Sequence, residues 1–97
     1  MNSISRLNSA LEDWRIANDV SLEWKGDTLR LVDESGTNRT VVCFPTAFWN
    51  AFANSSADRQ DSAIDSIRLA VELGYDARWM GAYAKEIAVP MSYVEEF

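Results

Sequence analysis

Apolar residues recur at intervals of three and four near the start of the chain. The positions concerned are Ile4, Leu7, Leu11 and Trp14. Residues with this spacing share one face of a helix. The pattern therefore predicts an amphipathic helix over residues 4 to 17, which ends before Asn18 and Asp19.

The next three apolar runs have the two-residue period of half-buried strands. Apolar and polar residues alternate over residues 20 to 25 and again over 28 to 31, and residues 39 to 44 are rich in β-branched side chains. Turn signals at Gly26-Asp27 and at residues 33 to 36 separate the runs. The sequence thus predicts a three-stranded antiparallel meander.

Helical periodicity returns in the second half of the chain. A short helix with the aromatic residues Phe48, Trp49 and Phe52 is expected to plug the sheet. Residues 57 to 73 form the clearest amphipathic pattern, with Gly74 as its stop. Asp76 can then cap a last helix over residues 77 to 88.

Together these elements predict an α+β fold with an N-terminal helix, a three-stranded antiparallel sheet and two to three further helices packed on it. The chain has 97 residues, of which 47% are apolar. This length is close to the commonest domain size, and this composition can supply one hydrophobic core. We therefore expect residues 1–97 to form a single domain.

The chain is strongly acidic. Fifteen Asp and Glu residues face nine Lys and Arg residues, for a formal net charge of -6. Such a charge repels nucleic acid and acidic membrane surfaces and steers encounters toward basic partners. We therefore expect no direct binding to nucleic acid or to a membrane, and a basic macromolecule as partner.

Candidate catalytic chemistry is sparse. The chain has no histidine and a single cysteine, Cys43, so disulfides and the common zinc sites are excluded. Glycine-rich phosphate loops and nucleophile elbows are also missing from the sequence. We expect no enzymatic activity, no metal and no cofactor. Cys43 lies in the apolar run of residues 41 to 44 and is expected to be a buried structural thiol.

A cytoplasmic location is expected. The sequence has no apolar stretch near the roughly 20 residues that a membrane span needs, and residues 1 to 6 lack a hydrophobic signal core. A reducing compartment also suits a chain with one cysteine.

Four acidic residues of the predicted helix 57 to 73 form a stripe. They are Asp58, Asp61, Asp65 and Glu72, spaced by three, four and seven residues. At about 100° per residue they share one side, opposite the apolar side. With a rise of about 1.5 Å per residue the stripe is about 21 Å long, a length along which several phosphates of a nucleic-acid strand would lie.

Two interpretations of this stripe stay open. It can be a solvated helix face, because acids near a helix N-terminus are favourable and Arg68 is within reach of Asp65 and Glu72. It can also be a binding face for a basic partner, extended by Asp76 just beyond the helix and by Asp33 and Glu34 in a turn. Turns favour Asp for conformational reasons alone.

Aromatic residues suggest a second surface. Trp14, Trp24 and Trp49 are expected in the core. Tyr75, Trp79 and Tyr83 recur every four residues and could form an exposed aromatic ridge beside the acidic helix. The sequence leaves open whether this ridge is exposed.

With its size, acidity, element order and acidic stripe, the chain resembles the DNA-mimic anti-CRISPR proteins of the type I-F systems, which are small inhibitors from phages and mobile elements. The resemblance implies an inhibitor in the host bacterial cytoplasm that occupies the positively charged DNA-binding site of a CRISPR surveillance complex. We expect a monomer rather than a dimer. Its carboxylates would replace phosphates. Arg59 and Arg68 in the same helix depart from a wholly acidic surface.

A small acidic chaperone or adaptor is the alternative. In that case apolar and aromatic surface, including Trp79 and Tyr83, would grip a protein client or form a homodimer.

Overall fold

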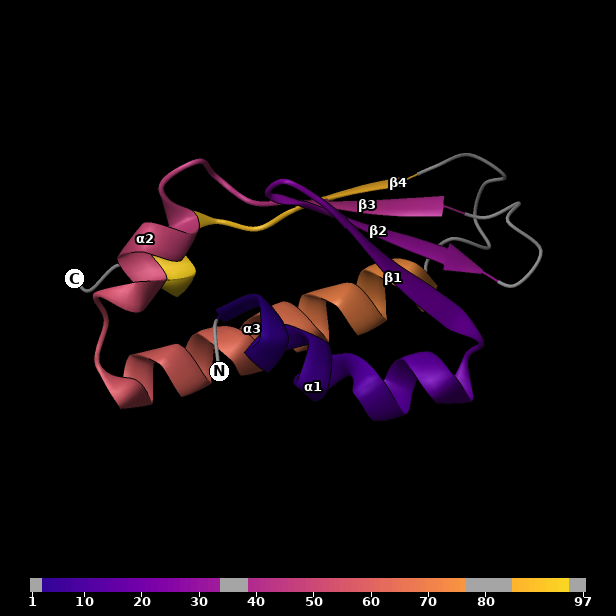
Figure 1. Ribbon diagram of the computed structural model, residues 1–97, viewed down its shortest axis with the longest axis horizontal. Helices are drawn as coiled ribbons and strands as arrows, with labels where there is room; N and C mark the ends of the chain where they lie inside the picture. The colour runs from indigo at the N-terminus through magenta and orange to yellow at the C-terminus, as the bar shows by residue number, and fades with distance from the viewer. Residues whose placement is uncertain (1–2, 34–38, 77–84, 95–97) are drawn as a thin grey trace.

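The computed structural model describes residues 3–33, 39–76 and 85–94. Its sheet lies on one side, with α1 and α3 beneath it and α2 at one end (Figure 1). The helices and strands are α1 (Ser3–Ala17), β1 (Val20–Lys25), β2 (Thr28–Asp33), β3 (Arg39–Cys43), α2 (Phe48–Ala53), α3 (Ala57–Asp76), β4 (Lys85–Ala88) and the 3-10 helix η2 (Met91–Tyr93). Among the described residues, no helix combines the length and the apolar character that crossing a membrane requires.

The predicted meander is confirmed, but it is part of a larger sheet. The strand order is β1-β2-β3-β4, in which β1, β2 and β3 are antiparallel neighbours and β4 lies parallel to β3. Gly26 has a φ of 61° in the two-residue turn between β1 and β2, a conformation that glycine adopts without strain. The fold is α+β with a four-stranded mixed sheet.

The predicted last helix is wrong over residues 85 to 88, which form β4, and residues 77 to 84 lie outside the described residues. Val42 of β3 pairs with Ile87, and the N–H of Val89 donates to the carbonyl oxygen of Cys43 at 2.9 Å. Backbone hydrogen bonds to β3 therefore decide the conformation of this segment, which is too short for its own periodicity to do so.

Gly74 does not end the helix, because α3 continues to Asp76. A Cβ atom at Gly74 would overlap Cδ1 of Ile87 and lie 2.9 Å from its Cγ1. The glycine thus lets α3 approach β4 closely. Asp76 is the last residue of α3, and the start of the helix that it was expected to cap lies outside the described residues.

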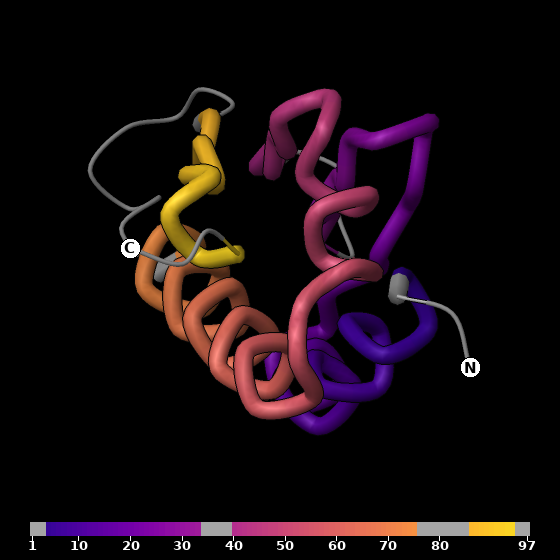
Figure 2. Tube along the Cα trace, turned by 90° about the vertical axis from the view of Figure 1, so that its left-hand side faces the viewer, coloured from indigo at the N-terminus to yellow at the C-terminus, as the bar shows by residue number. Residues whose placement is uncertain are grey.

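One core fills the space between the sheet and the helices. The view along the molecule in Figure 2 places α1 beneath β1 and α3 beneath β4. Trp14, Trp24 and Trp49 pack partly buried against this core, as predicted. The largest fully buried side chains are Tyr75, Phe48, Phe52, Leu7, Leu11, Leu29, Leu31, Ile67, Val42, Val71 and Thr40.

Tyr75 belongs to this core, so it does not form an exposed ridge. It is 1% exposed, and its ring meets the edge of Trp14 at 5.3 Å between centroids. The other two members of the expected ridge, Trp79 and Tyr83, lie outside the described residues. The spacing left open whether Tyr75 is exposed, and its packing against Trp14 of α1 decides that it is buried.

The short helix α2 closes one end of the core, as predicted. Phe48 and Phe52 are buried, and Trp49 packs between them with ring centroids 5.1 and 5.4 Å away. Phe44 and Trp24 extend the cluster onto the sheet, with their rings stacked on each other at 5.7 Å and Phe44 4.9 Å from Trp49. Aromatic packing thus fastens α2 to the sheet.

Cys43 lies on the sheet face that points away from the helices, and it is only partly buried. Burial, and then the charge and hydrogen bonding of Glu86, raise the pKa of the Cys43 thiol. The thiolate is the reactive form, so alkylation near neutral pH should be slow in the folded protein.

We expect Glu86→Gln to remove one cause of the raised pKa and to speed iodoacetamide alkylation of Cys43 at pH 8 at least about twofold. Mass spectrometry of the intact protein measures the rate. Glu23→Gln, on the same sheet face two strands from Cys43, is the control and should leave it unchanged. Equal rates in both variants would mean that Glu86 has no influence on the thiol.

Candidate functional site

Helix α3 runs along the outside of the molecule with one side in the core. It starts after Ser56, whose Oγ accepts a hydrogen bond from the backbone N–H of Arg59 at 3.2 Å, an N-cap. Ile67 and Val71 are fully buried on its inner side. The helix begins at Ala57, as predicted. Because its inner side is buried, the opposite side of α3 faces solvent.

The acidic stripe lies on this solvent side. Its members are Asp58, Asp61, Asp65 and Glu72. The side chains of Asp61 and Asp65 are 72% and 71% exposed, Asp58 is also exposed, and that of Glu72 is 25% exposed. The predicted arrangement along one helix side is therefore present, most openly in its first half.

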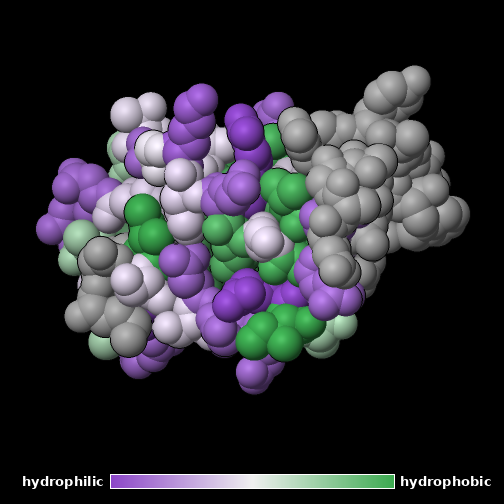
Figure 3. Space-filling view, turned by 45° about the vertical axis from the view of Figure 1, so that its right-hand side comes forward, coloured by the Kyte–Doolittle hydropathy of each residue, from purple (hydrophilic) through white to green (hydrophobic). Residues whose placement is uncertain are grey.

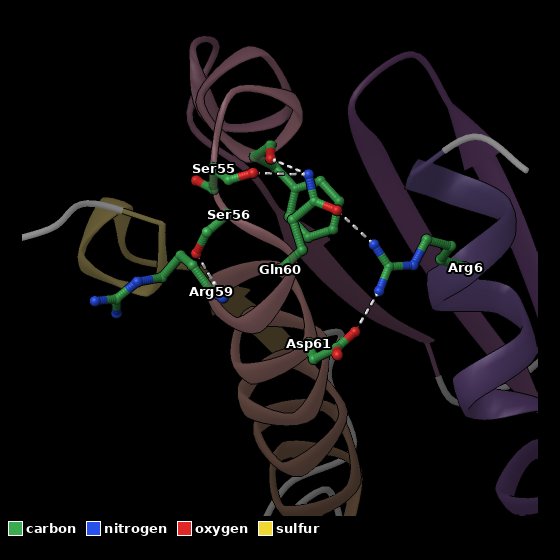
Figure 4. Close-up of polar contacts among 7 residues, drawn as sticks. Arg6, Ser55, Ser56, Arg59, Gln60 and Asp61 are labelled. Carbon is green, nitrogen blue, oxygen red and sulfur yellow. Dashed lines mark hydrogen bonds and ion pairs between the residues drawn. The ribbon is translucent and has the colours of Figure 1, made fainter.

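Arg6 of α1 reaches the first half of the stripe (Figure 4). Its Nη2 lies 2.6 Å from Oδ1 of Asp61, and its Nη1 donates to Oε1 of Gln60 at 2.8 Å. The guanidinium also lies 5.5 Å from the centre of the Phe52 ring. Gln60 in turn donates through Nε2 to the carbonyl oxygen of Phe52 at 2.9 Å. Arg6 therefore ties α1, α2 and α3 together and takes up part of the charge of Asp61.

Arg68 stands between the two later acids. Its guanidinium nitrogens lie 3.8 Å from Asp65 and 3.6 Å from Glu72. Pairs of this length on a surface contribute about 0 to 1 kcal/mol and exchange readily with solvent or a partner. Within the described part of the chain, Asp58 has no ion pair. The solvated-face and binding-face interpretations of the stripe both remain compatible with these distances.

Of the other predicted contact residues, only Asp76 belongs to α3. Asp33 is the last residue of β2, opposite Val20 of β1. Glu34 lies outside the described residues. Asp76 is the last residue of α3 and follows Glu72 by four residues, so the helix continues the spacing of the stripe to its end. The candidate site is therefore the stripe of α3, without a contribution from the sheet.

Two apolar residues on the outer side of α3 were missed. Leu69 and Leu73 are 51% and 69% exposed. Leu69 follows Asp65 by four residues and precedes Glu72 by three, so it interrupts the stripe. The same spacing that places the acids on one side places Leu69 there as well, and the sequence contained this signal. The outer side of α3 is thus acidic first and mixed with apolar residues later.

Acidic charge is concentrated in the helical layer. Helices α1 and α3 together carry seven acidic and four basic residues, whereas the four strands carry three acidic and four basic residues. A basic surface would therefore be attracted to the helices rather than to the sheet.

No protein-family model, curated protein or solved structure matches this chain.

Proposed function

We propose that the protein is a non-enzymatic inhibitor that presents the acidic stripe of α3 to the DNA-binding site of a type I-F CRISPR surveillance complex in the bacterial cytoplasm. Carboxylates would take the positions of phosphates and receive charge-assisted hydrogen bonds from Lys and Arg. Target DNA could then no longer enter.

The exposed first half of the stripe carries this proposal. Asp58, Asp61 and Asp65 lie within about two turns of one helix, and their carboxylates face solvent. A rigid helix holds such charges in a fixed row, which lowers the entropy cost of matching a fixed set of cations. Arg6 and Arg68 sit beside the row, so a partner's cations would have to compete with them for Asp61 and Asp65.

A competition experiment tests this function. Labelled target DNA is bound to a purified type I-F surveillance complex, and fluorescence anisotropy follows its displacement by the protein at low and high salt. The proposal expects displacement at low salt that weakens steeply as salt rises. A protein that neither binds the complex nor displaces DNA at any salt concentration would rule the proposal out.

Reversal of two stripe charges should weaken this inhibition. We expect the double variant Asp58→Lys/Asp65→Lys to bind about 30-fold more weakly, because two charge-assisted contacts are lost. The matched control Asp27→Lys/Glu86→Lys changes the net charge equally, at the β1–β2 turn and on the outer face of β4. Equal loss in both would point to net charge, and full binding by the stripe variant would exclude the stripe as the contact.

An adaptor for a protein client is the second candidate function, and exposed Leu69 and Leu73 favour it. In that case Leu69→Ser/Leu73→Ser would abolish client binding, whereas the charge reversals would not. Binding that persists at high salt would support this candidate over DNA mimicry.

A further inference from the structure

Strand β1 forms a free edge of the sheet in the described part of the chain. It is the first strand in the order β1-β2-β3-β4, and Figures 1 and 2 agree that no other described element lies along its outer side. Lys25 and Thr28 face each other across the two-residue turn, and the closing pair of such a hairpin is hydrogen-bonded. The alternation along the strand then directs the backbone N–H and C=O groups of Val20, Leu22 and Trp24 away from β2.

A shallow groove follows this edge between β1 and α1. Two adjoining hollows share Arg15 and Ser21 as lining residues, and one of them also includes Leu22. Leu22 and Trp24 are only partly buried, and Nε1 of Trp24 donates to Oδ1 of Asn8 in α1 at 2.8 Å. Figure 3 shows apolar side chains gathered among hydrophilic ones on the face of the molecule that it presents. The edge therefore offers both unpaired backbone groups and apolar surface.

We propose that a second copy of the chain pairs with β1 in antiparallel fashion, so that two four-stranded sheets join into one of eight strands. The new strand pair between the two copies of β1 forms the seam of this dimer. Because the free backbone groups belong to Val20, Leu22 and Trp24, these three residues of one copy must lie opposite the same three residues of the other copy across the seam. A two-fold axis at Leu22 achieves this, and such an interface is self-complementary.

Charge selects this register among its neighbours. With Leu22 opposite Leu22 of the second copy, Lys25 at the end of β1 lies across from Asp19 of that copy, twice by symmetry. Asp19 has a φ of 54° in the turn directly before β1, so this charge pair joins a strand end to a turn. A shift by two residues in one direction would set Glu23 opposite Glu23, and in the other direction Glu23 opposite Asp19. Like charges directly opposite each other destabilise a strand pair. The charges therefore favour this register over both of its neighbours. A shift by four residues would also match charges, with Glu23 opposite Lys25 twice, but it would pair only residues 23 to 25 of each β1.

The positions of α1 and α3 are compatible with this dimer. Helix α1 packs on β1, and its Arg15 and Glu12 are paired at 2.9 Å beside the groove. Next to their symmetry mates, these two residues can exchange partners between copies without leaving either charge unpaired. Helix α3 packs at the other edge of the sheet, near β4, so both acidic stripes stay accessible. The dimer departs from the monomer expected from the sequence.

Concentration-dependent association tests the proposal. Sedimentation velocity on the full chain from about 10 μM to about 1 mM should detect a dimer. Amide hydrogen exchange followed by NMR gives the specific readout: protection should rise with concentration at Val20, Leu22 and Trp24, whereas the amides of alternate residues in β1 are already bonded to β2. A monomer over the whole range, or protection that rises elsewhere, overturns the proposal.

Charge reversal tests the register. Lys25→Glu and Asp19→Lys should each dimerise about tenfold more weakly. An equimolar mixture of the two should regain wild-type affinity as a heterodimer, because the carboxylate introduced at position 25 of one chain then faces the lysine introduced at position 19 of the other. The second contact of this heterodimer keeps the original Asp19 and Lys25.

Circular dichroism checks that both variants fold, and Asp27→Lys in the adjoining turn is the control. Loss without recovery in the mixture, or undiminished dimerisation of both variants, contradicts the register. Binding of an extended foreign peptide at this edge to a monomeric protein would contradict the second copy as occupant.

Discussion

The Phe52→Ala variant should lose about 4 kcal/mol of its free energy of unfolding, the largest effect that we expect from a single substitution. Phe52 is 1% exposed and packs against Trp49 at 5.4 Å between ring centroids. Its removal opens a cavity where α2 closes the end of the core. It also removes the ring beneath the guanidinium of Arg6, so the pairing of Arg6 with Asp61 would lose its support.

Urea unfolding followed by tryptophan fluorescence measures this change. Phe52→Leu is the conservative control and should lose about 1 to 1.5 kcal/mol, because most of the apolar volume remains. A loss below about 1 kcal/mol for Phe52→Ala would show that α2 contributes little to the stability of the core.

The Gly74→Val variant should lose about 3 kcal/mol of its free energy of unfolding. At an exposed helix position, replacing glycine with alanine would stabilise the protein, because glycine is about 1 kcal/mol less favourable than alanine in a helix. Here the new side chain would overlap Ile87 of β4, and either Ile87 moves or β4 shifts from α3. Even Gly74→Ala should therefore not give the stabilisation that helix propensity alone predicts.

A double-mutant cycle with Ile87→Ala measures this contact. If Ile87 is the obstacle, Gly74→Val should cost at least about 1 kcal/mol less in the Ile87→Ala background than in the wild type. Ser62→Val, at an exposed position of the same helix, controls for the propensity of valine. Stabilisation by Gly74→Ala, or equal costs in both backgrounds, would refute the close approach as the reason for the glycine.

The earlier part of the fold, through α3, could be predicted from local patterns. Period-two alternation in β1 and β2, and the periods of α1 and α3, arise from the burial of one side of each element. Segment 85 to 88 could not be predicted in this way. It is four residues long, and its partner β3 lies far earlier in the chain, so its conformation depends on pairing that only the folded chain supplies.

The candidate site, too, could be predicted from the sequence only in part. The spacing of Asp58, Asp61 and Asp65 determined that they share one side of a helix, and the structure places them there. It could not indicate that Arg6 would reach Asp61, because the two residues are 55 positions apart. Packing of α1 beside α3 brings them together.

The sequence by itself determined the acidity of this protein, the meander, the amphipathic helices and the side of α3 on which the stripe lies, because charge and periodicity are properties of neighbouring residues. Only the tertiary structure decided that β4 joins the sheet in parallel, that Gly74 serves helix-to-strand contact, that Tyr75 is buried and that β1 is left as an edge of the described sheet. Each of these depends on which distant surface meets the element, and no local pattern encodes that surface.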